Sequence, residues 1–375
     1  MSGLCADFSI TYPENDKHCF AGLAVHPKDP KFIVAILEDH SKGDDPKNVA
    51  NVLCVINVEK PGEEPKLIAS KDPTQDFYGP PAFSPNGTHI AWQQWKHPYM
   101  PWDKSEIYIA DVKIDDSTFK LDNVRPVPFD LKDAPQVSLA YPNWSNDNTL
   151  IFTSDVSGFV NPWKYDVSNN STSAVFSEKV DRDFGCPMWS LHFFPFAVLD
   201  ETRSLFIGTE EGHDSLYSVD LKTPALPKKL DTGCVVIDGL RSLGNRKVVF
   251  AGTKVDEETK LVYFTVDASI RASVTDSDIE SADSDWISKP TSHTVQGNDG
   301  PVYVVYYEPK NPNYSGPPGT KPPCIVHVHG GPEWLQPQGL DWTKQYFTSR
   351  GWLWYVLPLV PLKTVKLMDI SLGWT

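Results

Sequence analysis

Short runs of apolar and β-branched residues, each closed by turn residues, recur from about residue 20 to residue 270. The clearest turn is residues 83–88 (FSPNGT), which is followed by the apolar run 90–92 (IAW). Asn and Gly tolerate the left-handed backbone of tight hairpin turns, and β-branched and aromatic side chains favour the flanking strands. The pattern therefore predicts hairpins in this part of the chain.

The hairpins group into about five units in which the strand order recurs at a spacing of roughly 45–55 residues, the length of a four-stranded propeller blade. Five unrelated hairpins in a β-sandwich are the alternative. The recurrence favours a partial β-propeller over residues 1–270.

Residues 267–289 are rich in Ser and Asp and poor in large apolar side chains, so we place a linker at 271–290. Beyond it the pattern predicts strands at 293–295 and 302–307, an apolar strand at 324–328, a helix at 341–349 and a strand at 352–356. A strand, turn, helix and strand begin a doubly wound α/β domain. Residues 291–375 are therefore interpreted as an incomplete α/β-hydrolase domain, and the chain as mostly β.

The apolar strand runs into His329, Gly330, Gly331 and Pro332. A glycine turn after a buried strand presents backbone N–H groups at the sheet edge, as an oxyanion hole requires. These four residues are oxyanion-hole candidates, and a plain strand-end turn is the alternative. His327 lies on the same strand face as His329, but no third ligand is near in sequence, so no metal site is predicted.

A second candidate site is an aromatic and proline-rich cluster that contains Trp95, His97, Tyr99 and Trp102. These side chains are candidates to line a substrate path, and packing between blades is the alternative. The adjacent carboxylates Glu210–Glu211 are of a type that can hold an amine, although a solvated turn is favoured there.

Charge and composition exclude several classes of binding partner and indicate a cellular location. The net charge of −15 over 375 residues argues against nucleic-acid partners and anionic membranes. No phosphate-binding glycine motif is present, so no cofactor is predicted. The six cysteines are scattered and form no C-x-x-C pair. The sequence shows no signal peptide and no apolar run long enough to cross a membrane. These features together predict a cytoplasmic protein.

Several stretches in order resemble the prolyl oligopeptidase family of serine peptidases, and most of all its acylaminoacyl-peptidase and dipeptidyl-aminopeptidase-like branch. They are residues 38–40 (EDH), 95–103 (WKHPYMPWD), 184–189 (FGCPMW), 307–312 (YEPKNP), 329–332 (HGGP) and 345–351 (QYFTSRG). The resemblance extends to about Trp352. It implies a propeller that filters access to an α/β-hydrolase domain, whose Ser–Asp–His triad hydrolyses short or N-blocked peptides.

The chain departs from this family at its ends. The family's first blades are expected before residue 1, and the sequence after Trp352 reads like a shifted frame or a translated intron. No G-x-S-x-G elbow occurs anywhere, so no catalytic triad residue is assigned. We therefore expect a serine-peptidase homologue truncated at both ends and inactive as this polypeptide. A non-catalytic propeller that binds or regulates is the alternative, with a peptide or a full-length homologue as its partner.

Overall fold

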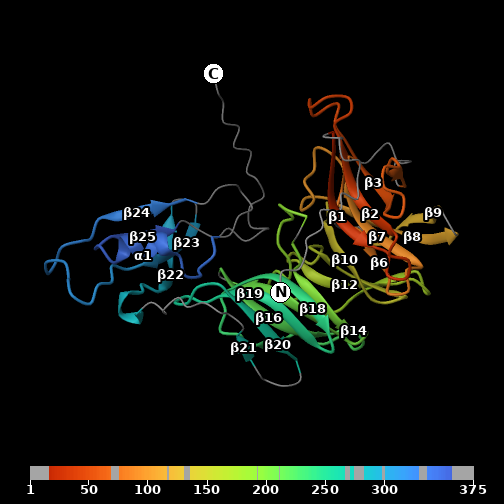
Figure 1. Ribbon diagram of the computed structural model, residues 1–375. Coiled ribbons are helices and arrows are strands. Elements are labelled where there is room, and N and C mark those ends of the chain that lie inside the picture. The colour runs from red at the N-terminus through yellow and green to blue at the C-terminus, as the bar shows by residue number, and fades with distance from the viewer. Residues whose placement is uncertain are drawn as a thin grey trace, which may run out of the picture.

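The structure is a computed structural model that describes residues 17–68, 76–115, 118–130, 136–191, 193–210, 212–266, 271–273, 283–297, 300–328 and 336–356. Strands dominate these residues and form six sheets (Figure 1). Five of the sheets are antiparallel and follow one another along the chain, each built from neighbouring strands. This order is the expected consequence of consecutive hairpins.

The first sheet contains β1 (His18–Val25), β2 (Phe32–Asp39), β3 (Ala50–Asn57) and β4 (Lys66–Leu67). The second contains β5 (Phe77–Tyr78), β6 (Ala82–Phe83), β7 (His89–Trp95), β8 (Glu106–Asp115) and β9 (Thr118–Pro126). The third contains β10 (Leu139–Asn146), β11 (Thr149–Ser154), β12 (Asn161–Asp166) and β13 (Ser171–Ala174).

The fourth sheet contains β14 (Phe196–Asp200), β15 (Arg203–Glu210), β16 (His213–Asp220) and β17 (Lys228–Leu230). The fifth contains β18 (Val236–Gly244), β19 (Lys247–Thr253), β20 (Lys260–Thr265) and β21 (Arg271–Ser273). These five sheets correspond to the five repeated units predicted from the sequence.

Turn residues join neighbouring sheets as well as neighbouring strands. In the turn before β7, Gly87 has φ +78° and its carbonyl lies 3.0 Å from Nε2 of His26, the residue after β1 of the first sheet. The Asn86 backbone N–H donates at 2.7 Å to Oδ1 of Asp147, which lies in the turn between β10 and β11 of the third sheet. One hairpin turn thus fixes the positions of three consecutive sheets.

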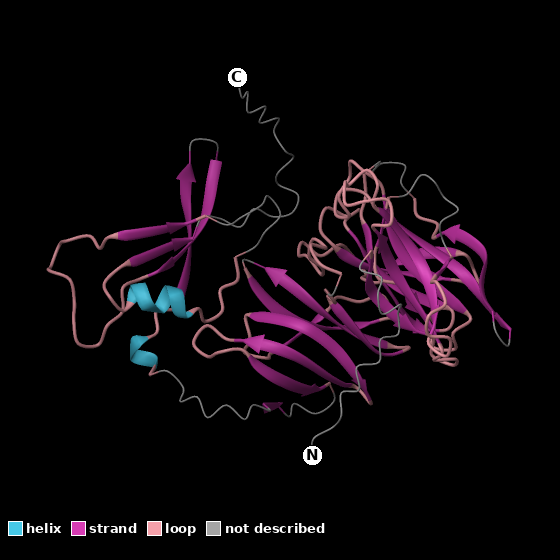
Figure 2. Ribbon diagram, turned by 45° about the horizontal axis from the view of Figure 1, so that its top comes forward, coloured by secondary structure: helices cyan, strands magenta, loops and turns pink. Residues whose placement is uncertain are grey.

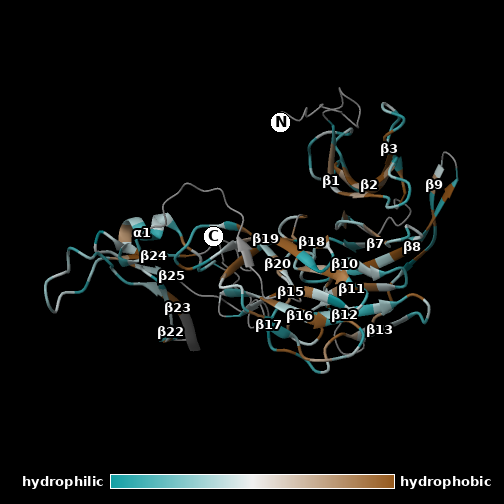
Figure 3. Cartoon of the chain, turned by 60° about the horizontal axis from the view of Figure 1, so that its bottom comes forward, coloured by the Kyte–Doolittle hydropathy of each residue, from teal (hydrophilic) through white to brown (hydrophobic). Residues whose placement is uncertain are grey.

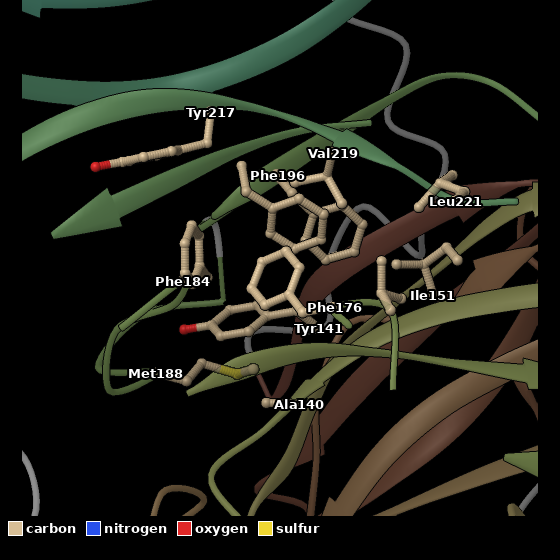
Figure 4. Packing of buried hydrophobic residues seen from close by; sticks show 12 residues of the cluster. Ala140, Tyr141, Ile151, Phe176, Phe184, Met188, Phe196, Tyr217, Val219 and Leu221 are labelled. Atoms are coloured by element: carbon tan, nitrogen blue, oxygen red, sulfur yellow. The ribbon is translucent and has the colours of Figure 1, made fainter. Parts of the chain in front are cut away.

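The hydrophobic core lies between successive sheets and not in one central mass. Figure 4 shows the layer between the third and fourth sheets, where Tyr141, Phe184 and Phe196 pack together. Other apolar layers separate the first sheet from the second, the second from the third, and the fourth from the fifth. Face-to-face packing of small four-stranded sheets is the blade packing of a β-propeller.

The five sheets follow an arc that is not closed into a ring (Figure 3). The predicted fold class, mostly β with a partial propeller of about five blades, is confirmed. Within the described residues, no helix is both long enough and apolar enough to cross a bilayer.

A mixed sheet follows the arc. Its strands are β22 (Pro290–Gly297), β23 (Gly300–Tyr307), β24 (Cys324–His327) and β25 (Leu353–Val356), in the order β22-β23-β25-β24, with β24 and β25 parallel. The helix α1 (Trp342–Thr348) connects the two parallel strands and lies beside the sheet (Figure 2). The Asp341 carboxylate caps it by accepting from the Thr343 N–H at 2.8 Å, and Phe347 packs on Trp354. The strand, helix and strand occur in the predicted order.

The segment predicted as a linker contains two described elements. The strand β21 pairs with β20 and so belongs to the fifth sheet, and the 3₁₀ turn η1 (Ser284–Trp286) precedes β22. The boundaries 1–270, 271–290 and 291–375 stay predictions.

Candidate functional site

The oxyanion-hole candidates His329, Gly330, Gly331 and Pro332 lie outside the described residues. The strand that leads to them, β24, ends at His327, whose ring stacks on Trp354 with centroids 5.8 Å apart. Their proposed role therefore stays a prediction.

The aromatic cluster, in contrast, is described in full. Trp95, His97 and Tyr99 line one pocket of about 170 Å³ at the end of β7. The other lining residues are Gln94, Lys96, Lys104, Ser105 and Glu106. We call this the β7–β8 pocket, because all eight residues lie at the ends of these strands or in the loop between them.

The aromatic residues that line the pocket are positioned by ring stacking, a hydrogen bond and a cation–π contact. Trp95 stacks on Phe77 of the neighbouring β5, with ring centroids 5.7 Å apart. The His97 backbone N–H donates to Asp76 Oδ2 at 2.9 Å. Lys104 Nζ lies 5.6 Å from the centre of the Tyr99 ring, a cation–π distance. These contacts give the aromatic walls a defined position.

Ser105 ties the pocket to the next sheet. Its buried hydroxyl accepts from Gln93 Nε2 at 2.9 Å and lies 2.9 Å from the carbonyl of Pro101 and 3.0 Å from that of Leu139, the first residue of β10. The Ser138 hydroxyl donates to the same Pro101 carbonyl at 2.8 Å. Buried hydrogen bonds of this kind restrain the loop that carries them, although Gln93 Oε1 has no hydrogen-bond partner among the described residues.

Gln94 is the polar group that the pocket leaves unpaired. Its side chain is 3% exposed, and its Oε1 accepts from the Trp92 indole N–H at 2.8 Å. An indole nitrogen only donates, so this bond fixes which end of the amide is the oxygen. Among the described residues, the buried Nε2 group then has no hydrogen-bond partner. Leaving such a donor unpaired costs about 1–3 kcal/mol.

The charged side chains that line the pocket have a net positive charge. Lys96 and Lys104 stand against the single carboxylate Glu106, which is paired in register with Gln94 across β7 and β8. Among the described residues, no ion pair involves either lysine. Aromatic walls with an uncompensated cation suit a carboxylate attached to a flat or apolar group.

Trp102 does not line the pocket. Its ring lies against Trp189, with centroids 4.4 Å apart, and so joins the loop after β7 to residues 184–189. This second segment is fixed in turn by Tyr141, whose hydroxyl donates to the Cys186 carbonyl at 2.6 Å. Two stretches that the sequence analysis selected separately are therefore in contact.

The carboxylate of Glu210 is occupied by an ion pair. Its Oε2 accepts from the Arg182 guanidinium, which also lies 5.0 Å from the centre of the Tyr217 ring. Glu211 lies outside the described residues. Glu210 therefore stabilises the end of β15 rather than offering a free carboxylate.

Sequence reasoning missed Gln94 and Lys104. A signal for Gln94 is present, because Gln93 and Gln94 interrupt an otherwise apolar strand between Trp92 and Trp95. Polar residues inside a predicted buried strand need partners, and so mark a hydrogen-bonded network or a ligand site. Lys104 carries no comparable signal, because its position depends on the fold of the loop.

No family model and no curated protein matches the chain. Solved structures do. A puromycin-hydrolysing peptidase of Mycobacterium tuberculosis superposes with a TM-score of 0.80 and 25% identity, over 92% of this chain and 52% of that one. A puromycin hydrolase gives a TM-score of 0.80 at 21% identity, over 91% and 50% of the two chains.

More distant structures share the fold. Oligopeptidase B from Trypanosoma brucei superposes with a TM-score of 0.61 and 13% identity, over 87% of this chain and 44% of that one. The chain thus spans about half the length of the peptidases it matches. The chain is thus similar in fold to the propeller-containing part of prolyl oligopeptidase-family structures.

Proposed function

We propose that this chain binds short peptides and does not hydrolyse them. Its 375 residues contain no G-x-S-x-G elbow, and the similar structures are those of peptidases. Loss of the nucleophile removes several orders of magnitude of rate, whereas peptide binding by other parts of the fold is a separate property.

The β7–β8 pocket carries the proposal, because it joins aromatic walls to two lysines that form no ion pair with other described residues, and to Gln94, whose buried Nε2 has no hydrogen-bond partner among them. Resemblance to the acylaminoacyl-peptidase branch favours peptides blocked at the N-terminus. Such peptides keep one charged end, the C-terminal carboxylate, and this is the group that the lysines and the amide suit. We propose a cytoplasmic location, which the scattered cysteines favour, and a full-length homologue as a candidate partner.

The test compares an N-acetylated dipeptide with its C-terminal amide, with binding measured by calorimetry. We expect the free acid to bind about tenfold more tightly, equivalent to about 1.4 kcal/mol, and Lys104→Gln to remove the difference. Lys113→Gln, an exposed change on β8 away from the pocket, serves as the control. Equal affinity for acid and amide, or no binding of either, would contradict the proposal.

A further inference from the structure

A second group of reactive side chains lies on the first sheet, away from the β7–β8 pocket. Cys19 of β1 is directly opposite Glu38 of β2 in the antiparallel register. His40 follows Glu38 by two residues, so the backbone directs both side chains to the same side of the sheet. The ligand atoms of Cys19, Glu38 and His40 all lie within 4.8 Å of one another.

The backbone around His40 is firmly held. Its N–H donates to the Lys17 carbonyl at 2.7 Å, and its own carbonyl accepts from the Gly43 N–H at 2.8 Å. The resulting turn brings Asp44 back to the ring, with Asp44 Oδ1 3.0 Å from His40 Nδ1. The other ring nitrogen, Nε2, lies 2.8 Å from Glu38 Oε1.

These distances place both ring nitrogens against carboxylate oxygens. An ionised carboxylate only accepts, so Asp44 requires a proton on Nδ1. In the neutral ring the Nε2 lone pair then faces the lone pairs of Glu38, a repulsive contact unless a cation lies between them. A second proton on Nε2 satisfies the 2.8 Å contact as it stands. A metal ion bound by both atoms, at bond lengths of about 2.0–2.2 Å, requires Nε2 and Oε1 to move slightly apart, and the nearby Cys19 sulfur supplies a third ligand atom for it.

Thiolate, imidazole and carboxylate together are a ligand set of Zn²⁺, with bond lengths of about 2.0–2.3 Å. A histidine that binds zinc through one nitrogen commonly donates its other N–H to a carboxylate, which fixes the ring. Asp44 has this position relative to His40. Cys19 is exposed, and Glu38 and His40 are partly exposed, so an ion can reach the group and water can complete its coordination.

We propose that Cys19, Glu38 and His40 bind a divalent zinc ion, and that Asp44 orients His40 for this purpose. Bound zinc would cross-link β1 to the end of β2, in addition to the hydrogen bonds that already pair the two strands. The sequence analysis considered a metal site only at His327 and His329, where no third ligand is near in sequence. Cys19 lies in a different strand from Glu38, so no ligand spacing reveals the group found here.

The proposal is tested on the full chain, treated with a chelator, desalted and kept reduced. Zn²⁺ is titrated against a chromogenic zinc indicator, and Co²⁺ serves as a spectroscopic probe of thiolate ligation. We expect one equivalent of Zn²⁺ and a thiolate-to-cobalt charge-transfer band. Cys19→Ser and His40→Gln should each weaken binding at least tenfold, and Asp44→Asn by about 10–100-fold. Cys324→Ser, a change at another exposed cysteine, should leave binding unchanged.

A measurement on the unaltered chain keeps the test independent of variant folding. Zn²⁺ should protect Cys19, but not Cys324, from alkylation as followed by mass spectrometry. Absence of binding at micromolar Zn²⁺ would overturn the proposal and favour a shared proton. Binding that persists unchanged in both Cys19→Ser and His40→Gln, or equal alkylation of Cys19 with and without zinc, would also overturn it.

Discussion

Cys54 lies in the middle of β3 with no exposed surface, and burial raises the pKa of its thiol to about 12. The reactive thiolate is therefore scarce at pH 8. In the metal-free native chain, iodoacetamide should modify the exposed Cys324 at least tenfold faster than Cys54, as quantified by peptide mass spectrometry. In urea the two should react alike. Equal rates in the native chain would show that the first sheet is not packed as described.

Lys344 is a buried cation on α1, 1% exposed, with its Nζ 3.4 Å from the Tyr307 hydroxyl and 3.3 Å from the Pro337 carbonyl. Burial lowers its pKa below the ordinary value of 10.5, against the opposing effect of Asp341. Between these two pKa values the unfolded chain binds more protons, so the lysine's contribution to stability rises with pH. Each unit of lowering costs about 1.4 kcal/mol at neutral pH.

Lys344→Met should therefore raise the melting temperature at pH 7, and the gain over the parent chain should shrink towards pH 10. Tryptophan fluorescence measures the melting, and Lys113→Met, on an exposed part of β8, is the control. A gain that is the same at pH 7 and pH 10 would show that titration of Lys344 is not its cause.

At the scale of elements, the turn before β7 should be sensitive to a single methyl group. A Cβ at Gly87 would lie 2.3 Å from His26 Nε2, and the residue has φ +78°. Gly158 also has a positive φ, +100°, but a Cβ there would meet nothing within 4 Å. Gly87→Ala should therefore destabilise the chain by about 2–4 kcal/mol in urea unfolding, and Gly158→Ala by about 1 kcal/mol. Equal losses would mean that the contact with His26 is unimportant.

Elements formed by local sequence could be predicted, whereas contacts between distant segments could not. Residues 83–88 and the helix capped by Asp341 were predictable, because turn chemistry, capping and strand period are local. The β7–β8 pocket was predicted only in part. The sequence analysis named Trp95, His97 and Tyr99, which line the pocket. It also named Trp102, which instead packs against Trp189. The loop between β7 and β8 is held against β10 by the hydrogen bond from Ser105 to the Leu139 carbonyl. Contacts between distant segments leave no periodic signal.

At the scale of the whole molecule, the ends of the arc leave apolar side chains exposed. Leu23 and Val25 of β1 are 56% and 53% exposed, and Leu243 of β18 is 51% exposed. Unpartnered apolar side chains on sheet faces favour association. Size-exclusion chromatography with light scattering should show association that increases with concentration, and Leu23→Glu with Val25→Glu should reduce it. A monomer at every concentration would contradict this expectation.

The chain has the fold of part of these peptidases, and its proposed lack of hydrolysis rests on the missing G-x-S-x-G elbow. Labelling with a fluorophosphonate probe tests this proposal most directly. The purified 375-residue chain should show no covalent adduct by intact mass, and no hydrolysis of an N-acetylated aminoacyl chromogenic substrate above the rate in buffer. A stoichiometric adduct on a serine, accompanied by turnover, would contradict the account.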